Sequence, residues 1–158
     1  MGKRVGYIGH SLIMYNKIIL KLEKSIENEI ENGADFFTMG THGDFDKLAL
    51  STCKILRKKY QNIQIEVAIT SLHVFDRPWF NAKSYNPYSD VKTIMYDIED
   101  LYYKKRITES NKQMIDNCDT LICYVDERRK KSGAKIILRY AQKKGVKIVN
   151  LFDPNDIF

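Results

Sequence analysis

The sequence has no apolar run that approaches the about 20 residues needed to cross a bilayer. Its basic start, MGKRVG, leads into an apolar stretch too short for a secretory signal, and Val5-Gly6 stand where a myristoylation signal would place a hydroxyl residue. We therefore expect no membrane partner. With 158 residues, of which 44% are hydrophobic and 29% are charged, the chain suits one globular domain over residues 1–158.

Cysteine is scarce as well, which excludes a disulfide scaffold. The three cysteines, Cys53, Cys118 and Cys123, are odd in number and lack metal-ligand spacing, as expected for reduced, mostly buried thiols of a cytoplasmic protein. Two histidines, His10 and His42, follow predicted strands, but no third ligand has a helpful spacing. The sequence therefore predicts neither a metal site nor a cofactor.

Neither of the two common phosphate-binding fingerprints is complete. The chain has no full G-x-G-x-x-G and no P-loop, so an ordinary NAD-dependent dehydrogenase or nucleoside triphosphatase lacks support. Internal repeats and low-complexity segments are missing too.

What the sequence has is a regular alternation of strands and helices. Apolar residues recur every three or four positions in the helices, while glycines and serines punctuate their ends; Ser11 and Ser132 are the predicted N-caps, and Gly33 and Gly145 the predicted C-caps. This order predicts an α/β fold, a three-layer Rossmann-like parallel sheet with helices on both faces. The predicted strands are 4–10, 34–40, 63–69, 119–125 and 146–152, and the predicted helices are 12–32, 44–60, 91–103, 108–117 and 132–145.

Residues 70–90 break this pattern with TSLHVFDRPWFNAKSYNPYSD, a loop long enough to be functional or mobile. The only tryptophan, Trp79, lies in this loop. It either stacks on a nucleotide base or anchors the loop on the core.

Three loops that follow strands contain glycine and a small hydroxyl residue at a helix entrance. In a parallel sheet these loops share one edge, and a helix N-terminus offers free N–H groups to an anion. Each loop alone is explained by turn and cap geometry, but together they predict a phosphate site. Asp44 suits the helix dipole, whereas Asp46 is predicted to bind ribose hydroxyls. The loop residues concerned are Gly9, His10, Ser11, Gly40, Thr41, His42, Gly43, Ser132, Gly133 and Lys135.

The net charge of +6 includes the basic runs 57–59, 104–106 and 128–131. These runs either solubilise helix ends or attract nucleic acid and phosphorylated ligands. For 128–131 both readings stay open, because that run lies in a loop beside a predicted helix entrance.

Two segments resemble the YpsA-type branch of the SLOG superfamily: GTHGDFDKLA, and ESNKQMIDNCDTLICYVDERRKKSGAKIILRYAQKKGVKIVNL. That superfamily shares a Rossmann-like fold with the LOG ("lonely guy") phosphoribohydrolases and the DNA-processing protein DprA. The resemblance implies a pocket for nucleotides or ADP-ribose-type derivatives. Relative to the LOG elements, Met114 is matched, but Ser110 replaces the arginine and Ile137 replaces the catalytic glutamate. Isoleucine cannot stabilise an oxocarbenium-like transition state, so LOG-type hydrolysis is not expected.

The leading hypothesis is therefore a cytoplasmic protein that binds or senses a nucleotide-derived small molecule. One alternative is a nucleoside or nucleotide N-glycosidase or transferase that uses Asp44, Asp46 or His42. The other is DprA-like binding of nucleic acid. Arg106 and Asn111 complete the predicted ligand contacts, and the tyrosines Tyr102 and Tyr103 offer aromatic surface for a homo-oligomer or fill the interior.

Overall fold

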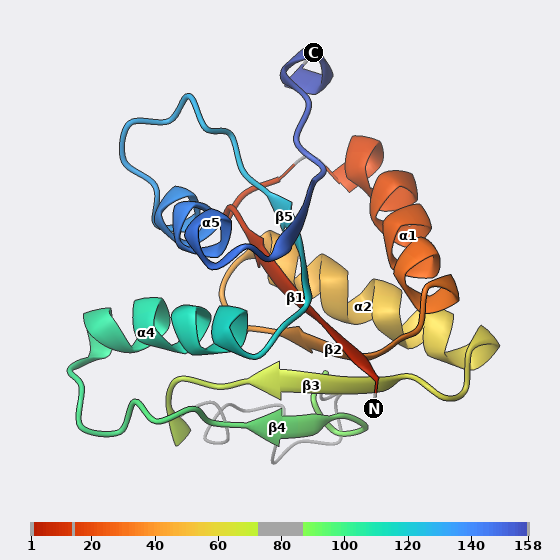
Figure 1. Cartoon of the computed structure of the whole chain (residues 1–158), viewed down its shortest axis with the longest axis horizontal. Helices are drawn as coiled ribbons and strands as arrows, with labels where there is room; N and C mark the ends of the chain where they lie inside the picture. The colour runs from red at the N-terminus through yellow and green to blue at the C-terminus, as the bar shows by residue number, and fades with distance from the viewer. Residues whose placement is uncertain (1, 14, 73–86, 158) are drawn as a thin grey trace.

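The computed structural model describes residues 2–13, 15–72 and 87–157. Its centre is an all-parallel sheet with the strand order β4-β3-β2-β1-β5-β6 (Figure 1). The predicted Rossmann-like fold is thereby confirmed. The strands are β1 (Lys3–Gly9), β2 (Ala34–Met39), β3 (Gln64–Ala68), β4 (Lys92–Ile94), β5 (Thr120–Tyr124) and β6 (Lys147–Asn150), and the helices are α1 (Tyr15–Glu31), α2 (Asp44–Lys59), α4 (Tyr103–Asp116) and α5 (Gly133–Lys144), followed by a 3-10 turn (Pro154–Ile157).

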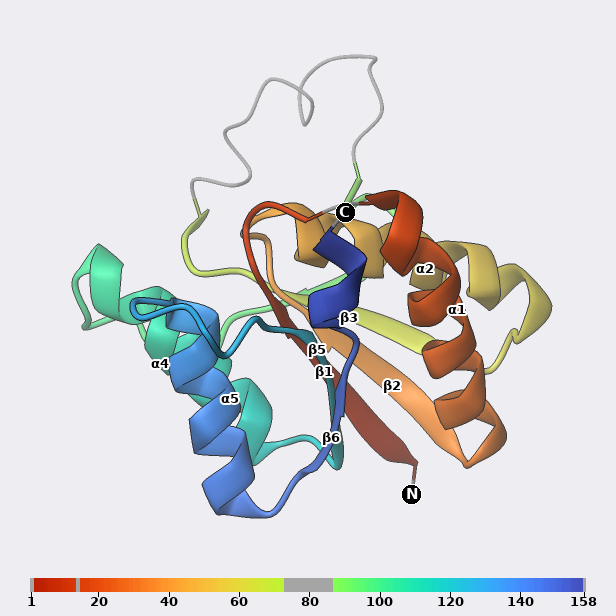
Figure 2. The same ribbon diagram turned by 90° about the horizontal axis from the view of Figure 1, so that it is seen from above.

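The helices form a layer on each face of the sheet. Helices α1 and α2 cover one face, and α4 and α5 cover the other (Figure 2). Each face has its own apolar core: Tyr7, Phe37 and Phe45 are fully buried on the α1/α2 side, whereas Met114 and Leu121 lie in the core on the α4/α5 side. Burial on both faces is why the central strands read as near-continuous apolar runs in the sequence.

Both predicted caps of α5 are confirmed. Ser132 accepts a hydrogen bond from the backbone N–H of Lys135 at 3.2 Å, and Gly145 adopts the left-handed conformation that ends the helix. Gly33, with a φ of 100°, likewise follows the end of α1.

Helix α1 begins later than the predicted residue 12, so Ser11 is not its N-cap. Residues 11–13 are irregular because Ser11 is held elsewhere: its carbonyl accepts the backbone N–H of Asp44 at 2.7 Å. A side chain at Gly43 would come within 2.6 Å of the Ser11 Cα. The chain after β1 therefore runs against the entrance of α2 before it turns into α1.

The predicted helix over residues 91–103 is wrong. This segment contains β4, which pairs with β3 through Glu66 and Lys92, Val67 and Thr93, and Ala68 and Ile94, and an irregular stretch follows it. Its apolar residues are spaced three or four positions apart, as in a helix, but the free edge of β3 offers backbone hydrogen bonds that override this local pattern. Helix α4 then begins at Tyr103, five residues before the predicted start at Thr108.

Strand β1 marks the point where the strand order reverses, because β2 pairs with one of its edges and β5 with the other. Ligands of open α/β sheets bind beyond the carboxyl ends of the strands at such a switch point. In this chain, the switch point lies beyond Gly9 and Tyr124, which are register partners.

An aromatic cluster closes the core beneath this switch point. The Phe45 ring stacks on Tyr124 at 6.3 Å between centroids and lies 6.4 Å from Tyr7. Phe45 presses on the backbone of β1: a Cβ added to Gly9 would lie 2.3 Å from the Phe45 ring. Glycine at position 9 is thus required by the packing of α2 on β1.

Replacing Gly9 with alanine is expected to destabilise the protein by about 1–3 kcal/mol, because a buried ring and the strand backbone must both shift. The matched control is Gly133→Ala, since a Cβ at Gly133 meets nothing within 4 Å. The control should change the free energy of unfolding by less than about 0.5 kcal/mol. Equal losses for the two variants in urea unfolding would contradict this account of Gly9.

Candidate functional site

A cavity of about 540 Å³ opens at the switch point, between the end of β1, the start of α2 with the loop before it, and the helices α4 and α5. Its volume lies within the range of small-molecule sites. Its lining combines aliphatic side chains with polar and cationic ones. The lining residues are Ile8, Gly9, His10, Ser11, Leu12, His42, Asp46, Ile107, Thr108, Asn111, Arg129, Lys131, Ser132, Gly133, Ala134 and Ile137.

The loop between β2 and α2 is organised by a carboxylate of its own. Asp46 accepts a hydrogen bond from the backbone N–H of His42 at 3.1 Å, and the backbone N–H of Gly40 also contacts this side chain. A Cβ at Gly40 would lie 2.8 Å from the Asp46 Oδ2. The amides of His42 and Gly40, which the sequence suggested for a phosphate, thus already bond to a side chain of the same protein.

Burial makes Asp46 an unusual acid. Desolvation raises its pKa from 3.8 to about 7, against the opposing effect of the amides of His42 and Gly40. Near neutral pH this side chain, which lines the cavity, is therefore present in both its protonated and its ionised form.

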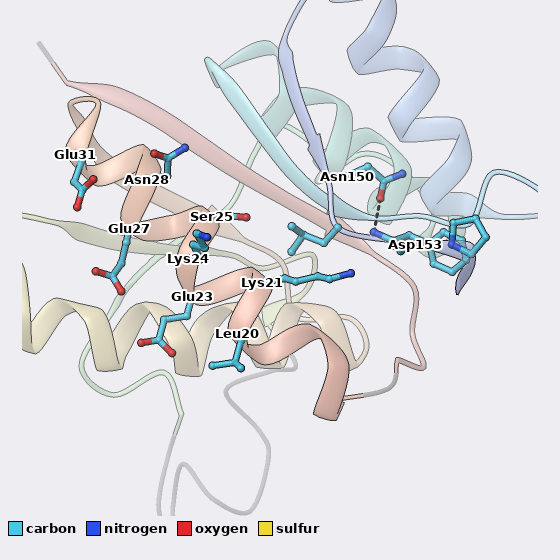
Figure 3. Close-up of a pocket in the computed structure, with 13 residues that line it drawn as sticks. Leu20, Lys21, Glu23, Lys24, Ser25, Glu27, Asn28, Glu31, Asn150 and Asp153 are labelled. Carbon is cyan, nitrogen blue, oxygen red and sulfur yellow. Dashed lines mark hydrogen bonds between the residues drawn. The ribbon is translucent and has the colours of Figure 1, made fainter. Parts of the chain in front are cut away.

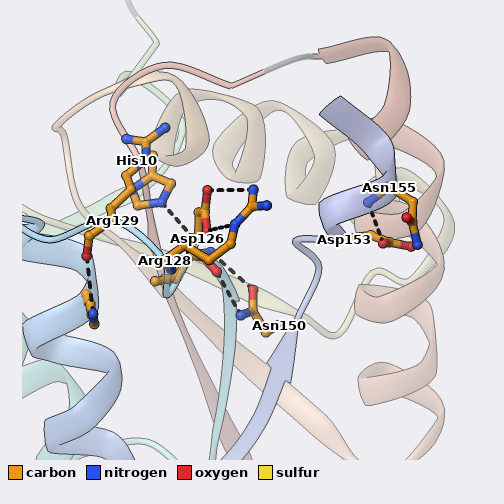
Figure 4. A network of polar contacts seen from close by, with 9 residues as sticks. His10, Asp126, Arg128, Arg129, Asn150, Asp153 and Asn155 are labelled. Carbon is orange, nitrogen blue, oxygen red and sulfur yellow. Dashed lines mark hydrogen bonds and ion pairs between the residues drawn. The ribbon is translucent and has the colours of Figure 1, made fainter. Parts of the chain in front are cut away.

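His10 connects the ends of β1 and β5. Its Nε2 accepts the backbone N–H of Asp126 at 2.8 Å, so this nitrogen carries no proton and the ring is neutral (Figure 4). Burial lowers the pKa of His10, and the nearby charge of Arg129 lowers it further, against the effect of Asp126. The Nδ1–H has no protein partner among the described residues, so it is free to donate to a ligand in the cavity.

His42 contributes a second imidazole. Its Nε2 lies 3.0 Å from the Thr70 Oγ1, a contact that joins the α2 loop to the end of β3. Burial lowers the pKa of His42 as well. Both histidines are therefore neutral hydrogen-bonding groups near pH 7.

The loop before α5 supplies the cations. Arg128 is paired with Asp126 at 2.9 Å, and this pairing holds the pKa of Asp126 down to about 2. Arg129 and Lys131 line the cavity, and among the residues that the structure describes neither has a carboxylate partner. The cavity therefore favours an anionic group near the N-terminus of α5.

The structure brings eight of the predicted site residues together around this cavity: Gly9, His10, Ser11, His42, Asp46, Asn111, Ser132 and Gly133. Ligand binding by them stays a prediction. Gly40, Thr41 and Gly43 do not line the cavity and instead shape the loop behind Asp46. Lys135 lines an adjoining groove, and Trp79 lies outside the described residues.

Arg106 also lies apart from the cavity lining. Its guanidinium donates to the backbone carbonyls of Leu101 at 2.7 Å, Thr70 at 3.3 Å and Glu99 at 2.9 Å. It therefore fastens the start of α4 to the end of β3.

Eight of the lining residues were not among the predicted ligand contacts: Ile8, Leu12, Ile107, Thr108, Arg129, Lys131, Ala134 and Ile137. Arg129 belongs to a basic run that was recognised, but the run did not indicate that Arg128 would be neutralised while Arg129 would not. On α4, Asn111 was predicted, but Ile107 and Thr108 carry no sequence signal of their own, because only the fold brings this helix to the end of β1.

A larger groove, about 1020 Å³, lies between α1 and the segment after β6 (Figure 3). Its lining mixes acidic and basic side chains, such as Glu23, Lys24 and Glu27, and none of the described predicted residues belongs to it. We place the candidate site at the switch point instead, where neutral histidines and unpaired cations converge.

Three further findings concern the described part of the chain. It contains no group of three or more His, Cys, Asp or Glu side chains that could hold a metal ion. None of its helices is long and apolar enough to span a membrane. The three cysteines are free, and burial raises the pKa of each thiol to about 12.

The fold and the cavity define a Rossmann-like α/β protein with a polar, cationic pocket at its topological switch point. The family model of the YspA SLOG family, YpsA, matches residues 5–154, and the chain belongs to this family. Membership implies binding of a nucleotide derivative. No curated protein matches the chain.

The pKa of Asp46 predicts a specific pH dependence. Between about pH 4 and pH 7 the folded protein keeps a proton on Asp46 that the unfolded chain has lost, so this residue's contribution to stability falls as the pH rises. Asp46→Asn cannot ionise, so it removes this pH-dependent loss of stability. The variant should gain stability relative to the wild type across this window, with a ceiling of about 4 kcal/mol.

Urea unfolding of both proteins at several pH values measures the difference. His10 and His42, whose lowered pKa values act in an overlapping pH range, contribute to both proteins and cancel to first order. A stability difference that does not change between about pH 4 and pH 8 would show that Asp46 titrates normally.

Proposed function

We propose that this protein binds a nucleotide-derived small molecule in the switch-point cavity. The phosphate end lies toward the N-terminus of α5, near Arg129 and Lys131, and His10 Nδ1–H donates to the ligand. The sugar lies toward Asp46. Gly9 and Ser11 line the floor at the end of β1, where their backbone and hydroxyl groups reach the same ligand.

The observation that carries this proposal is the polarity of the cavity. Three of the lining side chains, Ile8, Ile107 and Ile137, are aliphatic and suit the face of a base. The lining also carries two cations, Arg129 and Lys131, without carboxylate partners among the described residues, against a single lining carboxylate, Asp46. A nucleotide has this same division between an apolar ring and an anionic tail.

A second candidate function is cleavage of an N-glycosidic bond. It is favoured by Asp46, a carboxyl group in the cavity whose pKa of about 7 suits general acid–base catalysis near neutral pH. Ile137, which stands where the resemblance to LOG enzymes calls for glutamate, lines the same cavity and is buried. Asp46 is then the carboxylate available to the reaction.

Calorimetric titration with AMP, ADP-ribose and NAD tests the proposal, and chromatography of each mixture afterwards tests for release of free base. Urea unfolding with and without ligand gives a second readout. A ligand at about 100 times its dissociation constant should raise the free energy of unfolding by about 2.7 kcal/mol. Intact ligand after binding supports a binding protein. Free base that disappears with Asp46→Asn supports the glycosidase.

Gly133→Leu is the blocking variant for this site. Gly133 lines the cavity and has free space around its Cα, so leucine should fill the cavity without strain and lower the affinity at least about tenfold. Lys143→Leu, at an exposed position on the same helix, is the control. Equal binding by both variants, or no binding of any nucleotide by the wild type, would overturn the proposal.

A further inference from the structure

Thr70 follows β3 and connects two parts of the cavity lining, although it does not line the cavity itself. Its hydroxyl oxygen lies 3.0 Å from Nε2 of His42, in the loop before α2. Its backbone carbonyl accepts a hydrogen bond from the Arg106 guanidinium at 3.3 Å, near the start of α4. His42 lines the cavity, and so do Ile107 and Thr108, the next two residues of α4. Thr70 is therefore placed to set how both parts face a ligand.

The position of the Thr70 hydroxyl is fixed by its surroundings. Thr70 is buried, with 5% of its surface exposed. The preceding residue, Ile69, donates its backbone N–H to the carbonyl of Ile94 at 2.9 Å, which extends the pairing of β3 with β4. A β-branched side chain also has few accessible rotamers. The hydroxyl therefore determines the orientation of the His42 ring, and not the reverse.

The partner of each cavity histidine decides what its other ring nitrogen can offer. At His10 the partner is a backbone N–H, which can only donate, so Nδ1 of the neutral ring is always a donor. At His42 the partner is a hydroxyl, which can donate or accept. Nδ1 of His42 can therefore be a donor or an acceptor, as the ligand requires. Among the described residues, this nitrogen has no hydrogen-bond partner.

A sugar hydroxyl is the ligand group that matches Nδ1 of His42, because it also both donates and accepts. An ionised phosphate oxygen only accepts, and a fixed donor such as His10 suits it better. His42 also lies at the end of the cavity where the proposed function places the sugar, since its backbone N–H donates to the Asp46 carboxyl at 3.1 Å.

We infer that Thr70 is a positioning residue that holds His42 against a ribose hydroxyl, so that the site selects nucleotides with an intact ribose. When the Thr70 hydroxyl donates to Nε2, Nδ1–H donates to the ribose oxygen. When the Thr70 hydroxyl accepts from Nε2–H, Nδ1 accepts the ribose O–H. This inference rests on the proposed function for the position of the sugar.

The test compares AMP with 2′-deoxy-AMP and 3′-deoxy-AMP by calorimetry. The wild type should bind AMP roughly tenfold more tightly than one of the two deoxy analogues, because that analogue leaves the half-buried ring nitrogen unpaired. Thr70→Val keeps the shape of the side chain and removes the hydroxyl. It should weaken AMP binding roughly tenfold and reduce the preference over that analogue to within about twofold. Thr70→Ser restores the hydroxyl and should retain the preference.

Thr52→Val is the matched control. Thr52 is equally buried, and its hydroxyl donates to the backbone carbonyl of Leu48 at 2.7 Å, away from the cavity. This control should keep the wild-type affinities for all three nucleotides.

The imidazole ¹⁵N signals of the protein without ligand give an independent readout. The signals of His42 should shift in Thr70→Val and return in Thr70→Ser, while those of His10 stay unchanged. A role of Thr70 in packing alone predicts no change in the protonation of the His42 ring nitrogens.

Equal affinity of the wild type for the three nucleotides would overturn the inference and leave the proposed function standing. A preference that persists in Thr70→Val, or that is lost equally in Thr70→Ser, would do the same. Absence of binding by AMP, ADP-ribose and NAD would overturn both. Because the first comparison uses the wild type alone, it decides the matter even if Thr70→Val does not fold.

Discussion

The contact between Phe45 and Gly9 is the constraint on which the switch-point region depends. Phe45 belongs to the first turn of α2, and its ring packs on the last residue of β1. The same ring touches Tyr7 and Tyr124, so it joins β1, α2 and β5 in one aromatic cluster. Because the ring fixes where α2 begins, it also fixes Asp46 one residue further on, and with it the loop from Gly40 to Gly43.

Two further connections hold the opposite side of the site. His10 joins β1 to the backbone of Asp126, and Asn150 clamps the end of β5 through both the N–H and the carbonyl of Val125, at 3.1 and 3.0 Å (Figure 4). Arg128 closes this network by pairing with Asp126 and lying over the Phe152 ring at 5.5 Å. The loop before α5 is therefore anchored at its start, while Arg129 to Lys131 extend from it.

Much of the fold was accessible from the sequence, because its strands are buried on both faces and its helices are amphipathic. The buried face of α2 and both caps of α5 follow from local patterns. Strand β4 did not, since three residues at a sheet edge are defined by pairing with β3. The site was predictable in outline for the same reason that the sheet was: parallel strands bring their carboxyl ends together. Contacts such as that of His10 with Asp126, 116 positions apart, have no local signal.

The carboxylate of Asp46 has a consequence for the thermodynamics of binding. Many phosphate-binding loops become ordered only when the anion arrives, and the entropy of ordering then weakens the affinity. Here the loop from Gly40 to Gly43 is already closed around a side chain of the same protein. Its conformational entropy is lost during folding and not during recognition. Of this loop, His42 lines the cavity. A ligand that contacts it there therefore meets a backbone already held by hydrogen bonds to Asp46, so less conformational entropy remains to be lost on binding.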